Sequence, residues 1–260
     1  LTVTGGTLDA NGQAIAVGGN WTNVGIFTAG AGTVTLDAGS GTVDVTSGGS
    51  AFNHLVLNGG GGGTTFELED ALDVDGDLTI TGGTLDTNAA EDNAITIAGD
   101  WANGDVFTAN AGTVTFDDAG QTSTITGANT FNDLTCTTAG KPFVFPAGLT
   151  QTIGGTLTLT GTPASEIVLR SSTGGTRFTL DVTGGEQSVD EVDVQDSQTS
   201  SNDVVVYNGS NNGNNDDGEA SPHWIFRKRR YWVGGAGNWS DGASHWAATS
   251  GGAAGASVPD

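Results

Sequence analysis

The amino-acid sequence predicts an all-β protein whose chain coils into a β-solenoid. Three observations lead to this fold class: the composition is rich in turn residues, long segments of the chain repeat one another, and apolar residues alternate with polar ones in short runs. The chain has 260 residues, with 44 Gly, five Pro and no Met. β-Branched residues fit pleated strands, whereas Gly, Asn and Asp fit tight turns. We therefore expect many short strands and no long helix.

An internal repeat of about 78 residues organises most of the chain. The phrase LTVTGGTLD at residues 1–9 returns as LTITGGTLD at 78–86, and FNHLVL from Phe52 returns as FNDLTC from Phe131. A third, degenerate copy begins with GGTLTLTGT at residues 154–162. These matches divide the first part of the chain into superrepeats at residues 1–77, 78–153 and, in degenerate form, 154–226.

Within each copy, short runs alternate between apolar and polar residues. Val34 and Leu36 in TVTLD match Val114 and Phe116 in TVTFD. This period of two predicts strands with one buried face. At about 20 to 26 residues per coil, the chain would form roughly ten coils in a rod about 50 Å long. Antiparallel β-sandwich repeats are the alternative architecture, since they also consist of short, regularly spaced strands.

Differences between the copies support an inward and an outward face. Leu57 is replaced by Cys136, so an apolar residue replaces another at an inward position, whereas His54 is replaced by Asp133, so both residues are polar at an outward position. We therefore interpret the single cysteine as a small core residue. One cysteine also excludes an internal disulfide framework.

The charge of the chain limits its partners. Thirty acidic residues against seven basic ones give a net charge of −23, and such a surface repels phosphate backbones and anionic lipid. We expect no nucleic-acid partner and no membrane insertion, because no apolar run approaches the roughly 20 residues of a membrane helix. The acidity fits a need for solubility, or a salt-rich or calcium-rich surrounding.

Several phrases together resemble a known class of protein. GGTLDANG, IAVGGNWTN and GIFTAGAGTVTLD, then NNGNNDDGEASPHWIF and YWVGGAGNWSDGASHW, resemble segments of large bacterial and archaeal cell-surface proteins with autotransporter-like β-strand repeats. The resemblance covers nearly the whole chain. It implies a right-handed parallel β-helix in a secreted or surface-anchored protein with a role in adhesion or filament building. It implies no catalytic residues.

The densest acidic stretch, ELEDALDVDGDL, raises the question of a calcium site. Its alternating carboxylates include Asp73, Asp75 and Asp77, and Ca²⁺ takes six to eight oxygen ligands. The glycine falls at the fourth rather than the sixth position of an Asp-x-Asp pattern, so the stretch is not an EF-hand loop. We expect a solvated acidic face and no cofactor, with Ca²⁺ at these three residues as the sharper alternative.

A polysaccharide-degrading β-helix is the enzymatic alternative. A retaining glycosidase needs two carboxyl groups about 5 to 5.5 Å apart, and stacked coils bring side chains to nearly that distance wherever aspartates recur. Such a pair is therefore weak evidence for an active site unless it lies in a cleft. We expect no enzyme and no catalytic residue.

Aromatic residues gather near the end of the chain. Trp232, Trp239 and Trp246 lie seven residues apart in a glycine-rich segment. Such residues are hydrophobic anchors of a cap or first coil, or a surface on which sugars stack. Three Asn-x-Ser/Thr sequons offer glycosylation acceptors at Asn20, Asn208 and Asn238.

Four of the seven basic residues stand side by side: Arg227, Lys228, Arg229 and Arg230, followed by Tyr231 and Trp232. Residues 1–226 carry 28 acidic and 3 basic residues, whereas residues 227–260 carry 4 basic and 2 acidic ones. The charge thus changes sign where the HWIF phrase ends. We interpret residues 227–230 as a basic seam and residues 231–260 as the start of a next module or an assembly or capping segment. Cleavage by a processing protease is the alternative for the basic run.

These observations predict an extracellular or cell-surface structural solenoid that forms part of a fibre by end-to-end stacking. Its expected partners are copies of itself or adjacent modules of a longer chain. An adhesin that binds a host or glycan surface is the alternative function. The mechanism follows from the fold, since the end of a solenoid exposes unpaired backbone groups that a cap or another chain must satisfy.

Overall fold

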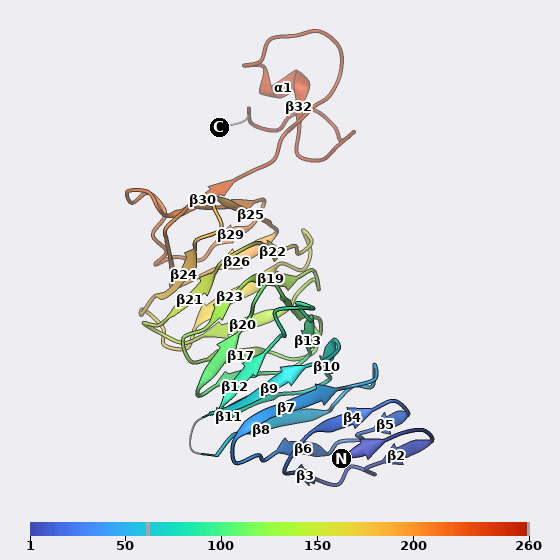
Figure 1. Ribbon diagram of the computed structural model, residues 1–260. Helices are drawn as coiled ribbons and strands as arrows, with labels where there is room; N and C mark the ends of the chain where they lie inside the picture. The colour runs from blue at the N-terminus through green and yellow to red at the C-terminus, as the bar shows by residue number, and fades with distance from the viewer. Residues whose placement is uncertain (61–62, 259–260) are drawn as a thin grey trace.

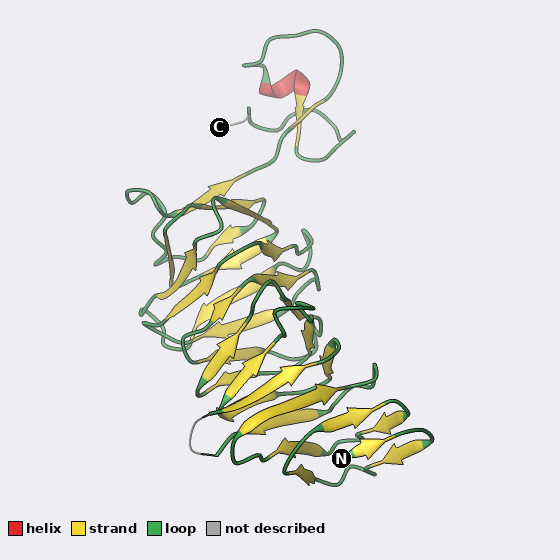
Figure 2. Cartoon of the chain, viewed as in Figure 1, coloured by secondary structure: helices red, strands yellow, loops and turns green. Residues whose placement is uncertain are grey.

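A computed structural model describes residues 1–60 and 63–258 and shows a stack of short parallel strands (Figure 1, Figure 2). The chain passes through three faces in turn, and a turn of the solenoid adds one strand to each face, except where an isolated bridge at Phe52 replaces the strand of the second face. The longest sheet holds ten strands, so the stack has about ten turns, as the sequence predicts.

The strands of each face follow one another in chain order. The first face holds β1 (Thr2–Val3), β4 (Trp21–Asn23), β7 (Gly41–Thr46), β9 (Thr64–Leu68), β12 (Thr84–Asp86), β15 (Val106–Thr108), β18 (Thr130–Phe131), β21 (Thr150–Ile153), β24 (Phe178–Val182) and β27 (Ser197–Ser200). The second holds β2 (Thr7–Asp9), β5 (Ile26–Thr28), β10 (Leu72–Val74), β13 (Ile95–Ile97), β16 (Thr113–Phe116), β19 (Asp133–Cys136), β22 (Leu157–Leu159), β25 (Gln187–Asp190), β28 (Val204–Tyr207) and β30 (Trp224–Arg227). The third holds β3 (Ile15–Val17), β6 (Thr33–Leu36), β8 (His54–Asn58), β11 (Leu78–Gly82), β14 (Trp101–Asn103), β17 (Ser123–Thr126), β20 (Pro142–Phe145), β23 (Ile167–Ser171), β26 (Val192–Val194) and β29 (Ser210–Asn211).

Apolar residues stack above one another along the faces. Leu55 pairs with Leu78, and Leu78 pairs with Trp101 one turn later. All three side chains are buried, and the buried residues form one continuous core. Cys136 belongs to this core, where burial raises the pKa of its thiol.

The pairing rules out the sandwich alternative. In the described part of the chain, every ladder among β1 to β30 is parallel, and the one antiparallel ladder joins β31 (Tyr231–Trp232) to β32 (Trp246–Ala247). An isolated antiparallel bridge between Thr162 and Ser165 lies in a turn. The one described helix is the short α1 (Gly242–His245). None of the described helices is both long and apolar enough to cross a membrane.

The sequence repeat and the turn of the solenoid have different periods. Ten strands and an isolated bridge at Phe52 precede β11, which begins the second copy. Eleven positions on three faces make three and two-thirds turns. Equivalent strands therefore lie on different faces: β1 lies on the first face, whereas its counterpart β11 lies on the third.

The two complete copies nonetheless build the same aromatic cluster. In the first copy, the Trp21 ring lies 4.9 Å from Phe27 and 5.1 Å from Phe52 between centroids. In the second copy, Trp101 lies 4.8 Å from Phe107 and 5.3 Å from Phe131. These clusters are inside the stack, so structure accounts for both tryptophans.

One hydrogen bond differs between the copies and makes a prediction. The indole nitrogen of Trp101 donates to Asn129 Oδ1 at 2.9 Å, whereas the buried indole nitrogen of Trp21 has no partner within the described structure. The residue equivalent to Asn129 is Ser50, whose hydroxyl accepts from Asn23 Nδ2. We expect Ser50→Asn to raise the free energy of unfolding by about 0.5–1.5 kcal/mol by supplying the missing acceptor. Chemical denaturation measures the change, and Ser50→Ala, which offers no acceptor, should lower the same quantity.

Candidate functional site

The two ends of the solenoid differ in how their strand edges are satisfied. At the N-terminal end, β1, β2 and β3 are the outermost strands of their sheets, and each pairs on one side only. Leu1 is 41% exposed there, whereas its repeat counterpart Leu78 is 1% exposed. An outermost strand presents backbone N–H and C=O groups to another strand. The N-terminal end is therefore an open edge in the described structure.

At the C-terminal end, a loop takes the place of a strand on the first face. Residues 212–223 connect β29 to β30, and two of their side chains contact β27. The Asn215 Oδ1 atom accepts from Ser197 N at 3.0 Å, and Asp216 Oδ2 accepts from Thr199 N at 2.7 Å. These two N–H groups of β27 would otherwise face a missing strand. We call residues 212–223 the cap loop, because their side chains close this edge.

Further contacts hold the cap loop in place. Asp216 Oδ1 accepts from Trp224 N at 2.8 Å, which ties the loop to β30. The Arg177 guanidinium donates to the carbonyl oxygens of Asn214 and Asn215, and it pairs with Glu219 at 2.8 Å. Asp216 is 3% exposed, and burial raises the pKa of its carboxyl group.

The basic run follows β30 and lies against the last turns. Lys228 Nζ donates to the carbonyl oxygens of Asn208 and Gly209. Arg229 pairs with Asp190 and lies over the ring of Tyr207. These contacts place Lys228 and Arg229 on the solenoid itself.

Arg227 and Arg230 differ from the two middle residues of the run. Arg227 is the last residue of β30 and is exposed. The guanidinium of Arg230 donates to the Ser257 hydroxyl at 2.9 Å, which ties it to the C-terminal segment. The run thus joins the last turns to the segment that follows.

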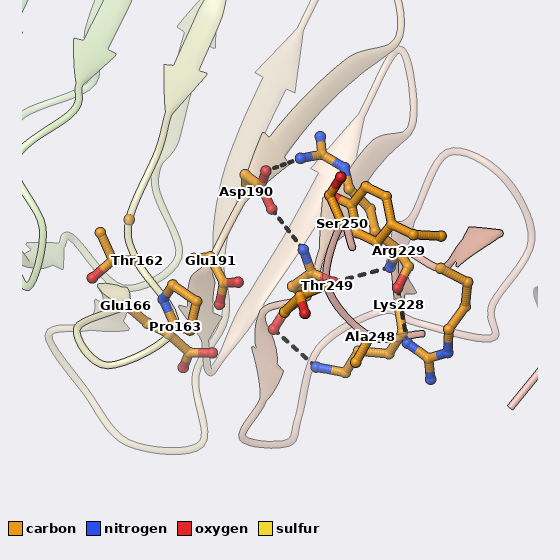
Figure 3. Close-up of a pocket in the computed structure, with 14 residues that line it drawn as sticks. Thr162, Pro163, Glu166, Asp190, Glu191, Lys228, Arg229, Ala248, Thr249 and Ser250 are labelled. Carbon is orange, nitrogen blue, oxygen red and sulfur yellow. Dashed lines mark hydrogen bonds and ion pairs between the residues drawn. The ribbon is translucent and has the colours of Figure 1, made fainter. Parts of the chain in front are cut away.

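A cavity of about 540 Å³ lies beside the basic run. In Figure 3, Glu166 and Glu191 lie on one side of it, and Lys228, Arg229 and residues 248–250 lie on the other. Burial raises the pKa of Glu191, with smaller contributions from the carboxylates of Asp190 and Glu166. The cavity thus lies between the last turns and the C-terminal segment, with both acidic and basic side chains in its lining.

The raised carboxyl groups predict how stability depends on pH. Four groups have a pKa above the ordinary range, chiefly through burial: Glu69, Asp73, Glu191 and Asp216. The folded chain binds their protons more tightly than the unfolded chain does. Their contribution to the stability of the fold is therefore complete below about pH 4 and is lost as the pH rises through their raised pKa values. We expect the melting temperature to be higher at pH 5.5 than at pH 7.5.

Two groups act in the opposite direction at lower pH. Hydrogen bonds hold the pKa of Asp118 and Asp203 below the ordinary range, so their contribution is lost only as the pH falls through those low values. Thermal unfolding followed by circular dichroism at several pH values measures the profile. An equal or lower melting temperature at pH 5.5 would contradict the expected sign.

The C-terminal aromatic residues form one cluster. Trp232 stacks on His245 with centroids 4.6 Å apart, and the rings of Trp239 and Trp246 meet edge to face at 4.5 Å. Trp246 is buried, whereas Trp239 is 67% exposed. Tyr231 and Trp232 pair with β32 in antiparallel fashion and add no parallel strand to the solenoid. The predicted segment 231–260 is described as far as residue 258.

The structure separates the three calcium candidates by their contacts. Asp73 and Asp75 lie at the surface, although the Asp73 carboxyl group is partly shielded from water. Asp77 Oδ1 accepts from Asp100 N in the next turn at 2.8 Å. Asp100 Oδ1 in turn accepts from Thr124 N at 2.7 Å. Within residues 1–60 and 63–258, no three His, Cys, Asp or Glu side chains are grouped so that they could hold a metal. Asp77 is thus a contact between turns of the solenoid.

The three sequon asparagines lie in different surroundings. Asn20 donates its side-chain amide to Asp44 Oδ2 at 2.7 Å, and Asn208 donates to Asp190 Oδ1 at 3.2 Å. Asn238 is exposed in the loop between β31 and α1. Of the three, Asn208 is the most enclosed, because it also accepts from Arg229 N.

Sequence reasoning missed a buried lysine. Lys141 is fully buried, and its Nζ donates to the carbonyl oxygens of Ala98 at 2.7 Å and Gln121 at 3.0 Å. Burial lowers the pKa of this amine. No pattern in the sequence marks Lys141 as internal. Its contacts with two earlier turns identify it as a link between successive turns.

The cap loop was also missed, although its sequence was noticed. The phrase NNGNNDDGEASPHWIF marks the end of the third copy, but nothing in it distinguishes Asn215 and Asp216 from their polar neighbours.

Comparison of the chain with protein-family models, with curated proteins and with solved structures finds no match in any of the three.

Proposed function

We propose that this chain is a structural segment of an extracellular fibre at the cell surface, in which solenoid turns stack end to end. The observation that carries the proposal is the open edge at β1, β2 and β3. Three neighbouring strands end the stack with one side free, and apolar residues beside them are more exposed than their counterparts inside the stack. Such an edge favours pairing with another strand.

The construction of the rod supports a mechanical role. Stacked turns share one continuous core, and each turn contacts mainly its neighbours, so further turns lengthen the rod without changing its cross-section. A location outside the cell is supported by the resemblance of the repeats to cell-surface proteins. The high negative charge keeps such rods apart laterally.

Electron microscopy of the native surface material tests the proposal. We expect fibres built of solenoid segments joined end to end, with an axial rise of about 4.8 Å per turn within each segment, the spacing of hydrogen-bonded strands. A matched sample treated to release the isolated chain provides the control and should show short rods. Short separate rods in both samples would contradict a fibre role.

A second candidate function is adhesion to a glycan surface, favoured by the exposed ring of Trp239. This ring lies 6.3 Å from that of Trp232 and nearly parallel to it, and flat aromatic surfaces stack against sugars. We expect Trp239→Ala to weaken glycan binding by about tenfold, which corresponds to the loss of one stacking contact of about 1.4 kcal/mol. A glycan array measures the binding. Val24→Ala, at an apolar residue that is 65% exposed on the solenoid, is the control and should leave it unchanged.

A further inference from the structure

The internal repeat identifies what covers the open edge. The first strands of the second copy are equivalent to those of the first copy, but they lie inside the stack. There, β11, β12 and β13 are each covered on their N-terminal side by β8, β9 and β10. The junction between the two copies thus shows the surface that fits the edge formed by β1, β2 and β3.

The register of that junction is defined by buried apolar pairs. Leu55 pairs with Leu78, and Phe66 pairs with Leu85. On the second face, Leu72 pairs with Ile95. All six side chains are at most 2% exposed. The residues of the open edge that take the places of Leu78, Leu85 and Ile95 are Leu1, Leu8 and Ile15, and each of them is more exposed.

The C-terminal end of the same chain does not present an equivalent surface. The cap loop covers β27, where the oxygens of Asn215 and Asp216 occupy two backbone N–H groups. Lys228 occupies the carbonyl oxygens of Asn208 and Gly209 beside β29. The last turn of a second molecule of this chain would therefore differ from the turn that β8, β9 and β10 form.

We propose that the open edge binds a preceding repeat of the same class, whose last turn is equivalent to residues 54–74, and that stacking is polar because the capped end accepts no such turn. The proposal rests on the proposed stacking function and specifies its partner and register. By this register, the preceding turn places its equivalents of Leu55, Phe66 and Leu72 over Leu1, Leu8 and Ile15. The chemistry is that of a parallel strand ladder with an apolar inner face.

A chain with residues 1–77 duplicated in front of Leu1 tests the proposal and requires no fibre. Asp77 then precedes Leu1 as it precedes Leu78 in the native chain, so the added copy enters in the predicted register. Amide hydrogen exchange is measured by mass spectrometry in the original first turn. We expect the amides of Thr2–Val3 and Thr7–Asp9 to exchange at least about tenfold more slowly than in the parent chain, because they become internal.

A matched variant and a cross-link make the result specific. Leu55→Asp with Phe66→Asp in the added copy alone should restore the exchange rates of the parent chain. Val56 and Thr79 are register partners in the native junction, so Val56→Cys with Thr79→Cys in the parent chain is a positive control for disulfide formation. Val56→Cys in the added copy with Thr2→Cys in the original copy should form the corresponding disulfide.

Two results would overturn the proposal. The first is unchanged exchange in the original first turn together with no cross-link between positions 56 and 2, while the control pair at 56 and 79 does cross-link. The second is dimerisation of the parent chain in sedimentation together with protection of the same amides. The open edge would then be covered by a second molecule of the same chain. If the duplicated chain behaves as expected but native material contains no fibres, the fibre function fails and the edge assignment stands.

Discussion

Asn129→Ala is expected to lower the free energy of unfolding by about 3–6 kcal/mol, because it removes the partner of several buried groups at once. Asn129 is 2% exposed. Its Oδ1 accepts from Trp101 Nε1 and from Asn103 Nδ2, each at 2.9 Å, and its Nδ2 donates to Gln151 Oε1 at 2.7 Å. An alanine leaves these three polar groups buried without a partner. Chemical denaturation followed by tryptophan fluorescence measures the loss.

The first copy of the repeat supplies the control. Ser50 occupies the position equivalent to Asn129 and makes fewer contacts, as its hydroxyl accepts from Asn23 Nδ2 and from Phe27 N. We expect Ser50→Ala to lower the free energy of unfolding by about 1–3 kcal/mol. Equal losses at the two positions would show that the additional hydrogen bonds of Asn129 add no stability beyond that supplied by Ser50 in the first copy.

Asp216→Ala is expected to open the capped end of the solenoid. The substitution removes the acceptor of two buried backbone N–H groups, those of Thr199 and Trp224. Leaving both without a partner should lower the free energy of unfolding of the last turns by about 2–6 kcal/mol. Faster amide exchange in β27 and β30 measures this loss. The freed edge should also promote association, which sedimentation velocity detects.

Asp216→Asn separates the hydrogen bonds from the charge. The amide keeps one acceptor oxygen but turns its NH₂ group toward the other N–H, so we expect a loss smaller than that of Asp216→Ala. A chain whose β27 amides exchange at the native rate in Asp216→Ala would show that the cap loop does not close this edge.

The strands and their inward residues could be predicted from the sequence because both follow from local patterns. Alternation in TVTLD and TVTFD places Leu36 and Phe116 inside, and both are fully buried. The repeat itself indicated a solenoid, since the same phrases recur over a long interval. The replacement of Leu57 by Cys136 was a correct sign of an inward position.

The placement of strands on faces could not be predicted from the same patterns. A repeat of eleven strand positions does not fill a whole number of three-faced turns, so β1 and β11 share a phrase but not a face. The bridge at Phe52 occupies one of these positions without forming a strand. Phe52 takes this position only through its parallel bridge with Val74 in the following turn.

Contacts between turns account for the rest of what was missed. The carboxylate of Asp77 belongs to a pattern that also suits Ca²⁺, and its contact with Asp100 N is visible only once the turns are stacked. The cap loop is a similar case, since Asp216 meets Thr199 only after β27 has taken its place at the end of the first face. Lys141 likewise reaches Ala98, 43 residues earlier in the chain.

Amide hydrogen exchange on native surface material tests the central claim most directly. Peptides that cover Leu1–Asp9 are compared with those that cover Leu78–Asp86, which carry nearly the same sequence inside the stack. If the open edge is a stacking surface, both sets of amides exchange slowly in native material, and only Leu1–Asp9 becomes fast in the isolated chain. Fast exchange of Leu1–Asp9 in native material, equal to that of the isolated chain, would contradict the claim that this edge joins the solenoid to another turn.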